Sequence, residues 1–277
     1  MTRKLRSDSV SDNCNTMIDV HCHYHDSRFD GYSDEEGANS RDSLIKRLAK
    51  SGIILIENGT NPKTNEEVLN LAARHDNMYA AVGIYPGESD IPPEDEDSVI
   101  EQLEKQLLSP KVVSIGEIGL DYYWDEPDRE IQKRWFGLML DLAEKHDLPV
   151  EIHNRESHGD MVEILSQRKN SRGLMHCFSG SAETARQLIS MGWHISFGGS
   201  VTFKNAKKTA AAAAAVPDDL LLIETDCPYM APMPHRGKTN RSDWMKYTVE
   251  RLAEIRGQTS EHIVEITTRN AKKLFGI

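Results

Sequence analysis

The sequence has few cysteines and no closely spaced pair of them. Cys14, Cys22, Cys177 and Cys227 form no Cys-x-x-Cys motif and no disulfide-rich pattern. The last three each lie beside a polar residue in or at the end of an expected strand. Alternation along a strand turns such neighbours to opposite sides, so these thiols should face the surrounding helices. We therefore expect buried, reduced cysteines rather than disulfides or thiolate ligands.

Long apolar runs are also missing. No window approaches the ~18 uninterrupted apolar residues that a membrane span requires. Residues 1–16 begin with basic residues but have no apolar stretch behind them, which predicts no secretory signal. We expect this segment to be a poorly ordered extension and residues 17–277 to be the folded unit. We also expect a cytoplasmic protein with no membrane contact and no obligate protein partner.

Positive charge is scarce: 33 Lys and Arg residues face 44 Asp and Glu residues, for a formal net charge of −11. This balance counts against broad electrostatic capture of DNA by the surface. It does not exclude a nuclease, because bound divalent ions would reverse the potential around the acidic residues of a metal site.

The length suits one (β/α)8 barrel, which needs ~250 residues plus small extensions. Short apolar runs alternate with amphipathic segments, and eight such units in one domain favour a closed parallel barrel over a doubly wound sheet. We therefore predict an α/β fold, a single (β/α)8 TIM barrel. The expected strands span residues 17–22, 53–58, 79–84, 112–117, 149–153, 173–177, 193–197 and 220–225. The clearest helix follows a possible cap at Asp128, and others are expected over 203–216, 242–256 and 259–275.

Residues able to bind metal fall at the C-terminal ends of the expected strands, where (β/α)8 enzymes build their active sites. His21 and His23 end the first strand, and period-two geometry points both imidazoles the same way, so that one ion can bind both. Glu117 ends the fourth strand, His153 the fifth and His176 the sixth, and Asp226 follows the eighth.

A lone histidine on a strand is more often a core residue, but six such groups at one end of a barrel are costly to bury unpaired. Divalent cations remove that cost. These six ligands suggest two ions, and the sequence leaves open whether the metal is Mg²⁺, Mn²⁺ or Zn²⁺. One ion would bind His21, His23 and Asp226, the other His153 and His176, with Glu117 bridging them.

Five segments in the same order resemble the TatD family of metal-dependent deoxyribonucleases, within the amidohydrolase-like barrels. They read IDVHCHYHD, GEIGLDYYWD, PVEIHNRES, LMHCFSGS and ETDCPYMAP, and the similarity extends over nearly all of residues 17–277. The resemblance implies the barrel fold, two divalent metals and a 3′-to-5′ deoxyribonuclease whose substrate is single-stranded DNA. The metal ligands that it implies are His21, His23, Glu117, His153, His176 and Asp226.

Two segments depart from the family pattern. Residues 83–87 read GIYPG where members often read GIHPH, and residues 240–242 read NRS in place of NEP. The first change leaves the metal ligands intact and bears on substrate preference. Tyr85 can donate a hydrogen bond to a phosphate oxygen, or it can pack.

The mechanistic hypothesis is hydrolysis by a water that two ions ~3.5–4 Å apart activate near neutral pH. Asp226, beside the bridging Glu117, would accept the proton of this water and pass it to the leaving 3′ oxygen.

Three further regions are candidates for substrate contact, each with a structural alternative. Arg155 can bind a phosphate through two hydrogen bonds, or form a salt bridge that orients a loop. Ser179 begins a segment whose backbone N–H groups can hold a phosphate or simply start a helix. Tyr122 and the two aromatic residues after it can stack on unpaired bases or pack.

Two other functions remain open at this point. The same metal centre can hydrolyse an amide, ester, lactone or aminoacyl bond, because such barrels host many hydrolyses. The acidic net charge and Tyr85 favour this alternative slightly, whereas the order of the motifs opposes it. A catalytically idle scaffold is disfavoured, because idle relatives usually lose a ligand and this chain keeps all six.

Overall fold

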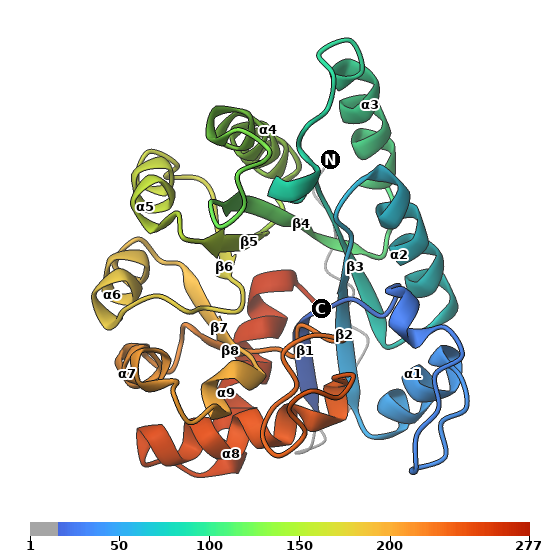
Figure 1. Ribbon diagram of the computed structural model, residues 1–277, viewed down its shortest axis with the longest axis vertical. Helices are drawn as coiled ribbons and strands as arrows, with labels where there is room; N and C mark the ends of the chain where they lie inside the picture. The colour runs from blue at the N-terminus through green and yellow to red at the C-terminus, as the bar shows by residue number, and fades with distance from the viewer. Residues whose placement is uncertain (1–15) are drawn as a thin grey trace.

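The computed structural model describes residues 16–277. The extension predicted over residues 1–16 therefore lies, apart from Thr16, outside the described residues. The described part is one sheet of eight parallel strands in the order of the sequence, curled into a nearly closed barrel with helices around it (Figure 1). This confirms the predicted TIM barrel. The strands are β1 (Met17–Cys22), β2 (Ile53–Asn58), β3 (Met78–Val82), β4 (Val112–Asp121), β5 (Val150–Arg155), β6 (Gly173–Met175), β7 (His194–Phe197) and β8 (Leu221–Ile223).

Helices follow the strands in alternation, as the amphipathic segments predict. Among residues 16–277, no helix combines the length and the apolar character that crossing a bilayer requires. The α-helices are α1 (Arg41–Lys50), α2 (Pro62–Arg74), α3 (Glu96–Gln106), α4 (Arg129–His146), α5 (His158–Ser166), α6 (Ala182–Ser190), α7 (Lys207–Ala215), α8 (Met245–Arg256) and α9 (Ser260–Phe275). Short 3-10 helices are η1 (Ser27–Phe29), η2 (Pro86–Glu88), η3 (Gly199–Thr202) and η4 (Ser242–Trp244).

The boundaries differ from the prediction where pairing with a neighbour decides them. β4 continues four residues beyond Glu117 because Leu120 and Asp121 pair with Asn154 and Arg155 of β5. The helix expected from residue 203 begins only at Lys207. The cap predicted at Asp128 is confirmed, since its side chain accepts a hydrogen bond from the Glu130 N–H.

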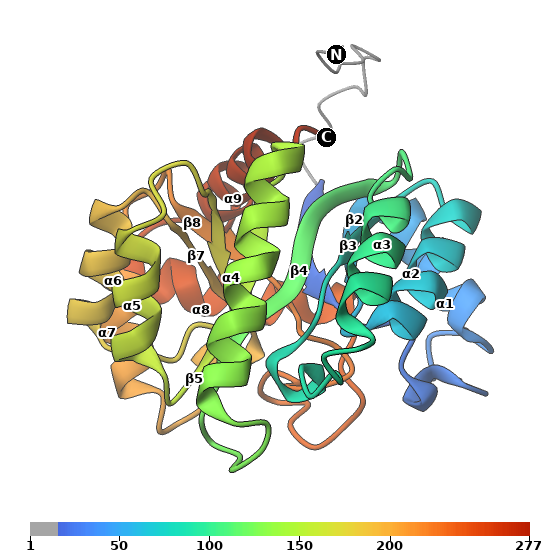
Figure 2. The ribbon, with the colours of Figure 1, turned by 90° about the horizontal axis from the view of Figure 1, so that it is seen from above.

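The two ends of the barrel are different. At the end where the strands begin, inward residues such as Ile18, Val20 and Leu222 pack against Leu274 and Phe275 of α9. Figure 2 shows the C-terminus at this end, while the loops that follow β4 and β8 project from the opposite end. Since α9 covers one mouth, the residues at the strand ends are reached only from the other.

β1 and β8 meet through backbone bonds at the open end. The Asp226 N–H donates to the His21 carbonyl at 2.9 Å, and the His23 N–H donates to the Cys227 carbonyl at 2.7 Å. The register of β1 also shifts between Asp19 and Cys22. Such irregularities re-aim side chains: Val20 faces the interior of the barrel, whereas Cys22 packs in the layer between strands and helices.

The buried carboxylate of Asp19 ties this seam together. It accepts hydrogen bonds from the Thr225 N–H at 2.8 Å and from the Ser242 hydroxyl at 2.6 Å, so it joins β1 to the segment after β8 and to η4. All three residues are buried. Breaking this contact leaves buried donors without partners, which is among the costlier changes in a protein interior.

We expect Asp19→Ala to lower the free energy of unfolding by about 3 kcal/mol, because at least two buried donors lose their acceptor. Asp30→Ala, which removes only the exposed ion pair with Arg41, should cost less than about 1 kcal/mol. Urea unfolding followed by circular dichroism measures both. Equal midpoints for the two variants would show that Asp19 does not hold the seam.

Candidate metal centre

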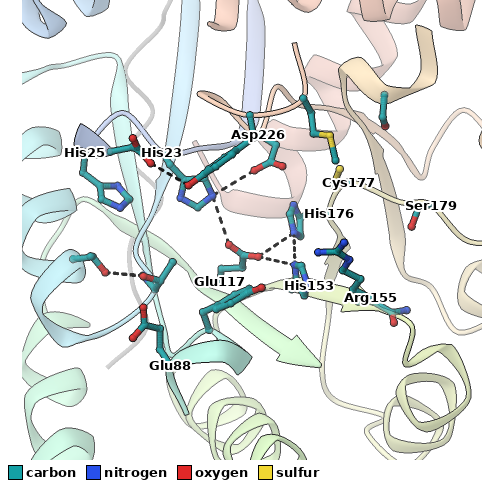
Figure 3. A pocket seen from close by; sticks show the side chains of 18 of the residues that line it. His23, His25, Glu88, Glu117, His153, Arg155, His176, Cys177, Ser179 and Asp226 are labelled. Atoms are coloured by element: carbon teal, nitrogen blue, oxygen red, sulfur yellow. Dashed lines mark hydrogen bonds and ion pairs between the residues drawn. The ribbon is translucent and has the colours of Figure 1, made fainter. Parts of the chain in front are cut away.

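The structure brings together all six residues that the sequence singled out as metal ligands (Figure 3). They come from β1, β4 and β5 and from the segments directly after β1, β6 and β8. Three overlapping groups have ligand atoms within 4.8 Å of one another: His21, His176 and Asp226; His21, His23 and Glu117; and Glu117, His153 and His176. This arrangement has the donor types and spacing that divalent transition metals bind.

Glu117 lies at the centre and divides the cluster into two halves. Its Oε2 atom is 3.5 Å from His21 Nε2 and 3.6 Å from His23 Nε2. Its Oε1 atom is 2.9 Å from His153 Nδ1 and 3.1 Å from His176 Nε2. Each carboxylate oxygen thus faces its own pair of imidazoles, which is the geometry of a bridging ligand. Asp226 Oδ1, 3.5 Å from His23 Nε2, belongs to the first half.

The outer nitrogen of each imidazole is directed to an acceptor. His21 Nδ1 lies 3.0 Å from Glu151, His23 Nδ1 lies 3.0 Å from the Asn58 carbonyl, and His153 Nε2 lies 3.1 Å from Asp121. His176 Nδ1 lies 3.4 Å from Glu224 Oε1. The hydrogen bonds of His21, His23 and His153 fix their outer nitrogens as N–H donors and leave the inner nitrogens as lone pairs, which is how metal-binding histidines are usually oriented. His176 Nδ1 forms no hydrogen bond and faces Glu224 as an ion pair only.

The inner nitrogens lie too close together to stand without a cation. His21 Nε2 and His23 Nε2 are 3.1 Å apart, as are His153 Nδ1 and His176 Nε2. In neutral rings held by those acceptors, both members of each pair aim a lone pair at the other. Metal ions or protons must therefore lie between them, and the cluster fits divalent metal.

The charge balance of the cluster leads to the same conclusion. Burial alone would lower the pKa of His21 and His23, but contacts with Glu117, Glu151 and Asp226 raise them to about 10 and about 9. Burial would raise the pKa of Glu117, yet His176, His153 and His21 hold it well below its usual range. Without metal the histidines hold protons. Metal binding must therefore release protons, and metal affinity must fall as the pH falls.

The sequence interpretation missed the acidic residues that orient these histidines. Glu151 lies two positions before His153, and Glu224 lies two positions before Asp226. Residues two apart along a strand share a face, so Glu151 in β5 gave a usable signal. Glu224 and Asp226 follow the end of β8 at Ile223, so strand alternation gives no such signal there. Glu151 also accepts the Ser114 hydroxyl at 2.6 Å, and Glu224 accepts the Cys177 N–H at 2.7 Å.

Tyr85 lines the cavity above the second half of the cluster, but its hydroxyl donates to a protein group. It lies 2.9 Å from Asp121 Oδ2, the same oxygen that faces His153 Nε2. Burial and the nearby carboxylates raise the pKa of Tyr85, so the hydroxyl keeps its proton. In this geometry Tyr85 acts on His153 through Asp121, and the donation to a phosphate that the sequence suggested competes with that bond.

The cluster opens into a cavity of about 1160 Å³ whose lining includes Arg155, Ser179, Trp124 and Tyr229. Arg155 forms no ion pair within residues 16–277; its guanidinium lies over the Tyr123 ring at 3.7 Å. The salt bridge considered for Arg155 is therefore absent from this part of the chain, and its charge is available to an anion. Ser181, not Ser179, caps α6 by accepting the Thr184 N–H.

The structure favours the packing alternative for Tyr122 and contradicts the expectation for Cys177. Tyr122 is not among the lining residues, and its hydroxyl donates to Asp160 at 2.7 Å, so this geometry gives it no substrate contact. Cys177 was expected to face the helices, and this was wrong: it lines the cavity. β6 ends at Met175 and Cys177 has a φ of 42°, so strand alternation no longer applies there. Cys22 and Cys227 are buried and unpaired with other cysteines, as expected.

We expect Glu151→Gln to weaken metal binding about tenfold, because an amide is a poorer acceptor for His21 Nδ1 than a carboxylate. Isothermal titration of the metal-free protein measures this affinity. The matched control is Glu104→Gln, which removes a carboxylate that accepts from His146 far from the cluster. If both variants bind metal as the parent does, Glu151 does not support the site.

We also expect Tyr85→Phe to weaken metal binding about fivefold, since one hydrogen bond to Asp121 is lost. Tyr122→Phe loses a hydroxyl bonded to Asp160 instead and should bind metal like the parent protein. Isothermal titration of the metal-free proteins measures both affinities. Unchanged metal affinity together with weaker binding of inorganic phosphate would instead assign the Tyr85 hydroxyl to the substrate.

Comparisons with known proteins agree with this geometry. The model of the family described as TatD related DNase matches residues 18–276. An uncharacterized metal-dependent hydrolase of Bacillus subtilis, YabD, is 39% identical over 263 residues, which cover 94% of this chain and 99% of the relative. An uncharacterized metal-dependent hydrolase of Mycobacterium tuberculosis, TatD, is 33% identical over 273 residues, covering 94% of this chain and 98% of that protein.

Solved structures show the same similarity. The crystal structure of YjjV, a TatD homologue from Escherichia coli, superimposes with a TM-score of 0.85 at 31% identity, covering 96% of this chain and 100% of the other. A TatD family hydrolase from Entamoeba histolytica has a TM-score of 0.79 at 22% identity over 94% of this chain and 98% of its own, which supports the fold alone. This chain belongs to the TatD family of metal-dependent hydrolases.

Proposed function

We propose that this hydrolase is a deoxyribonuclease that cleaves phosphodiester bonds of single-stranded DNA from the 3′ end with two divalent ions. The observation that carries the proposal is the division of the Glu117 carboxylate, with one oxygen facing His21 and His23 and the other facing His153 and His176. Two ions that share one carboxylate are typical of sites that hydrolyse phosphate esters. The family match supports the choice of DNA as substrate.

The ligand assignment follows the two halves of the cluster. His21, His23 and Asp226 would hold one ion, His153 and His176 the other, and Glu117 both. When bound, the ions supply Lewis acidity that lowers the pKa of water and offsets charge on the phosphate oxygens.

Asp226 is the residue of this chain placed to move the proton. Its side chain is partly exposed to the cavity, and its backbone N–H is fixed by the His21 carbonyl at 2.9 Å. It can accept a proton from the attacking water and return it to the leaving 3′ oxygen. Arg155, with no carboxylate partner among residues 16–277, can bind a non-bridging phosphate oxygen at the rim.

The test is product mapping with metal-free protein that is reloaded with Mg²⁺, Mn²⁺ or Zn²⁺ in turn. We expect single-stranded DNA labelled at its 5′ end to shorten stepwise from the 3′ end, and chelation to abolish the reaction. Asp226→Asn should lower kcat about 10²- to 10⁴-fold, because it removes the proton acceptor. Glu117→Ala should lose bound metal as well as activity.

Metal analysis of each variant shows which step has failed. Full hydrolysis by both variants would contradict the mechanism. Turnover of amide, lactone or aminoacyl substrates without turnover of DNA or RNA would contradict the choice of substrate, while leaving the metal-dependent hydrolase intact.

A further inference from the structure

Exposed apolar side chains gather at the mouth of the cavity. Seven large hydrophobic residues are exposed in the described part of the chain, and five of them lie in two loops, the one after β4 and the one after β8. Both loops project from the open end of the barrel (Figure 2). Single exposed hydrophobic residues need no explanation, but a cluster beside a cavity marks a binding surface. The five residues are Tyr123, Trp124, Tyr229, Met230 and Met233.

An arginine from another segment packs on the aromatic rings of each loop: Arg155 from the end of β5 and Arg28 from η1. In the Trp124 cluster (Tyr123, Trp124 and Arg155), the guanidinium lies 3.7 Å from the Tyr123 ring centre and 5.9 Å from that of Trp124. In the Tyr229 cluster (Arg28 and Tyr229), the guanidinium lies 4.2 Å from the ring centre. In both clusters the guanidinium covers one face of a tyrosine ring and leaves the other face to a ligand. Arg155 has no carboxylate partner among residues 16–277, whereas Asp26 lies 3.8 Å from Arg28 Nε and accepts the Tyr229 hydroxyl at 3.0 Å.

The two clusters flank the two halves of the metal centre. Tyr229 lies 6.2 Å from His23, ring centre to ring centre, and so borders the first half. Arg155 ends β5 two residues after His153 and lies beside the second half (Figure 3). Trp124, Arg155 and Tyr229 all line the cavity that contains the ligands.

We infer that these clusters are two base-stacking subsites, one on each side of the phosphate that is cleaved. The aromatic ring of each cluster stacks on an unpaired base, and the arginine binds the adjoining phosphate. This inference rests on the proposed function. It adds the places where the bases on either side of the cleaved phosphate bind. A flat aromatic group joined to an anion is the chemistry that both clusters match, and stacking accepts any base because every base has a π-face.

An apolar protein partner fits these clusters less well. Its hydrophobic side chains would not need a guanidinium over each ring, nor a surface continuous with a cavity of metal ligands. Arg155 forms no ion pair within residues 16–277, so the Trp124 cluster offers a positive charge to a polyanion although the chain has a net charge of −11. In a duplex, stacking on neighbouring base pairs hides the base faces, so duplex DNA must fray before it can bind here.

The first measurement is binding without turnover. Fluorescence anisotropy of a dye-labelled single strand, with EDTA present, gives its affinity for the parent protein, Trp124→Ala and Tyr229→Ala. Each variant should bind about 10- to 100-fold more weakly, because one stacked base is lost. Leu108→Ala is the matched control: Leu108 is 76% exposed but lies outside both loops, and this variant should bind like the parent protein.

A strand with abasic sites identifies the contact as stacking. The parent protein should bind this strand as weakly as the variants bind the normal one, and Trp124→Ala should weaken it no further. Trp124→Phe, which keeps a ring, should restore part of the affinity. Intrinsic fluorescence gives a second readout, since Trp124 is 58% exposed while Trp135, Trp193 and Trp244 are buried. Normal strands should quench it and abasic strands should not.

The outcomes separate this inference from the proposed function. If the parent protein hydrolyses DNA but the variants bind strands as it does, or lose equal affinity for normal and abasic strands, the subsites are wrong and the nuclease stands. If binding depends on bases and on both clusters but no nucleic acid is cleaved with any metal, the subsites stand and the nuclease is wrong. With turnover, Trp124→Ala should raise KM more than it lowers kcat, as expected for uniform binding.

Discussion

The metal centre depends on one constraint: four imidazole nitrogens point at one another and at the carboxylate of Glu117. Three rings are held by hydrogen bonds from behind, His21 by Glu151, His23 by the Asn58 carbonyl and His153 by Asp121. The fourth, His176, faces Glu224 at 3.4 Å. These outer contacts decide which nitrogen carries hydrogen. The inner lone pairs then have no stable arrangement except around cations, so metal dependence follows from the hydrogen bonding behind the ligands as much as from the ligands themselves.

One end of the barrel is closed by apolar packing, and the other end carries the polar groups of the metal centre. α9 seals the end where the strands begin, with Leu274 and Phe275 packed onto the inward apolar residues. At the other end, the strands give way to polar groups that only metal or hydrogen bonds can satisfy. The seam where β1 meets the segment after β8 belongs to both ends. Asp19 joins β1 to Thr225, and the metal-competent His21 and Asp226 lie close to these two residues in the sequence.

The cavity itself has a floor and a rim with different roles. The floor contains the six metal-competent residues. The rim is formed by loops, which a (β/α)8 barrel can vary without disturbing its core. The family resemblance covers both, because Trp124 and Tyr229 lie in the segments GEIGLDYYWD and ETDCPYMAP. Net charge is a poor guide to such a cavity, because its lining includes Arg155, which forms no ion pair within residues 16–277, beside carboxylates such as Asp26 and Glu88.

The sequence by itself determined the barrel, the six metal-competent residues and their order along the strands. It could do so because strand periodicity and the position of strand ends are local properties, and His21, Glu117 and Asp226 each end or follow an apolar run. Only the tertiary structure decided how those groups are oriented. The contact of His21 with Glu151 joins residues 130 positions apart, and the donation of Tyr85 to Asp121 joins residues 36 apart. Cys177 faces the cavity because β6 ends early, and Arg155 rests on Tyr123 because the end of β5 meets the loop after β4. Such contacts depend on side-chain torsions and on neighbours that are distant in the chain, and no local pattern of residues specifies them.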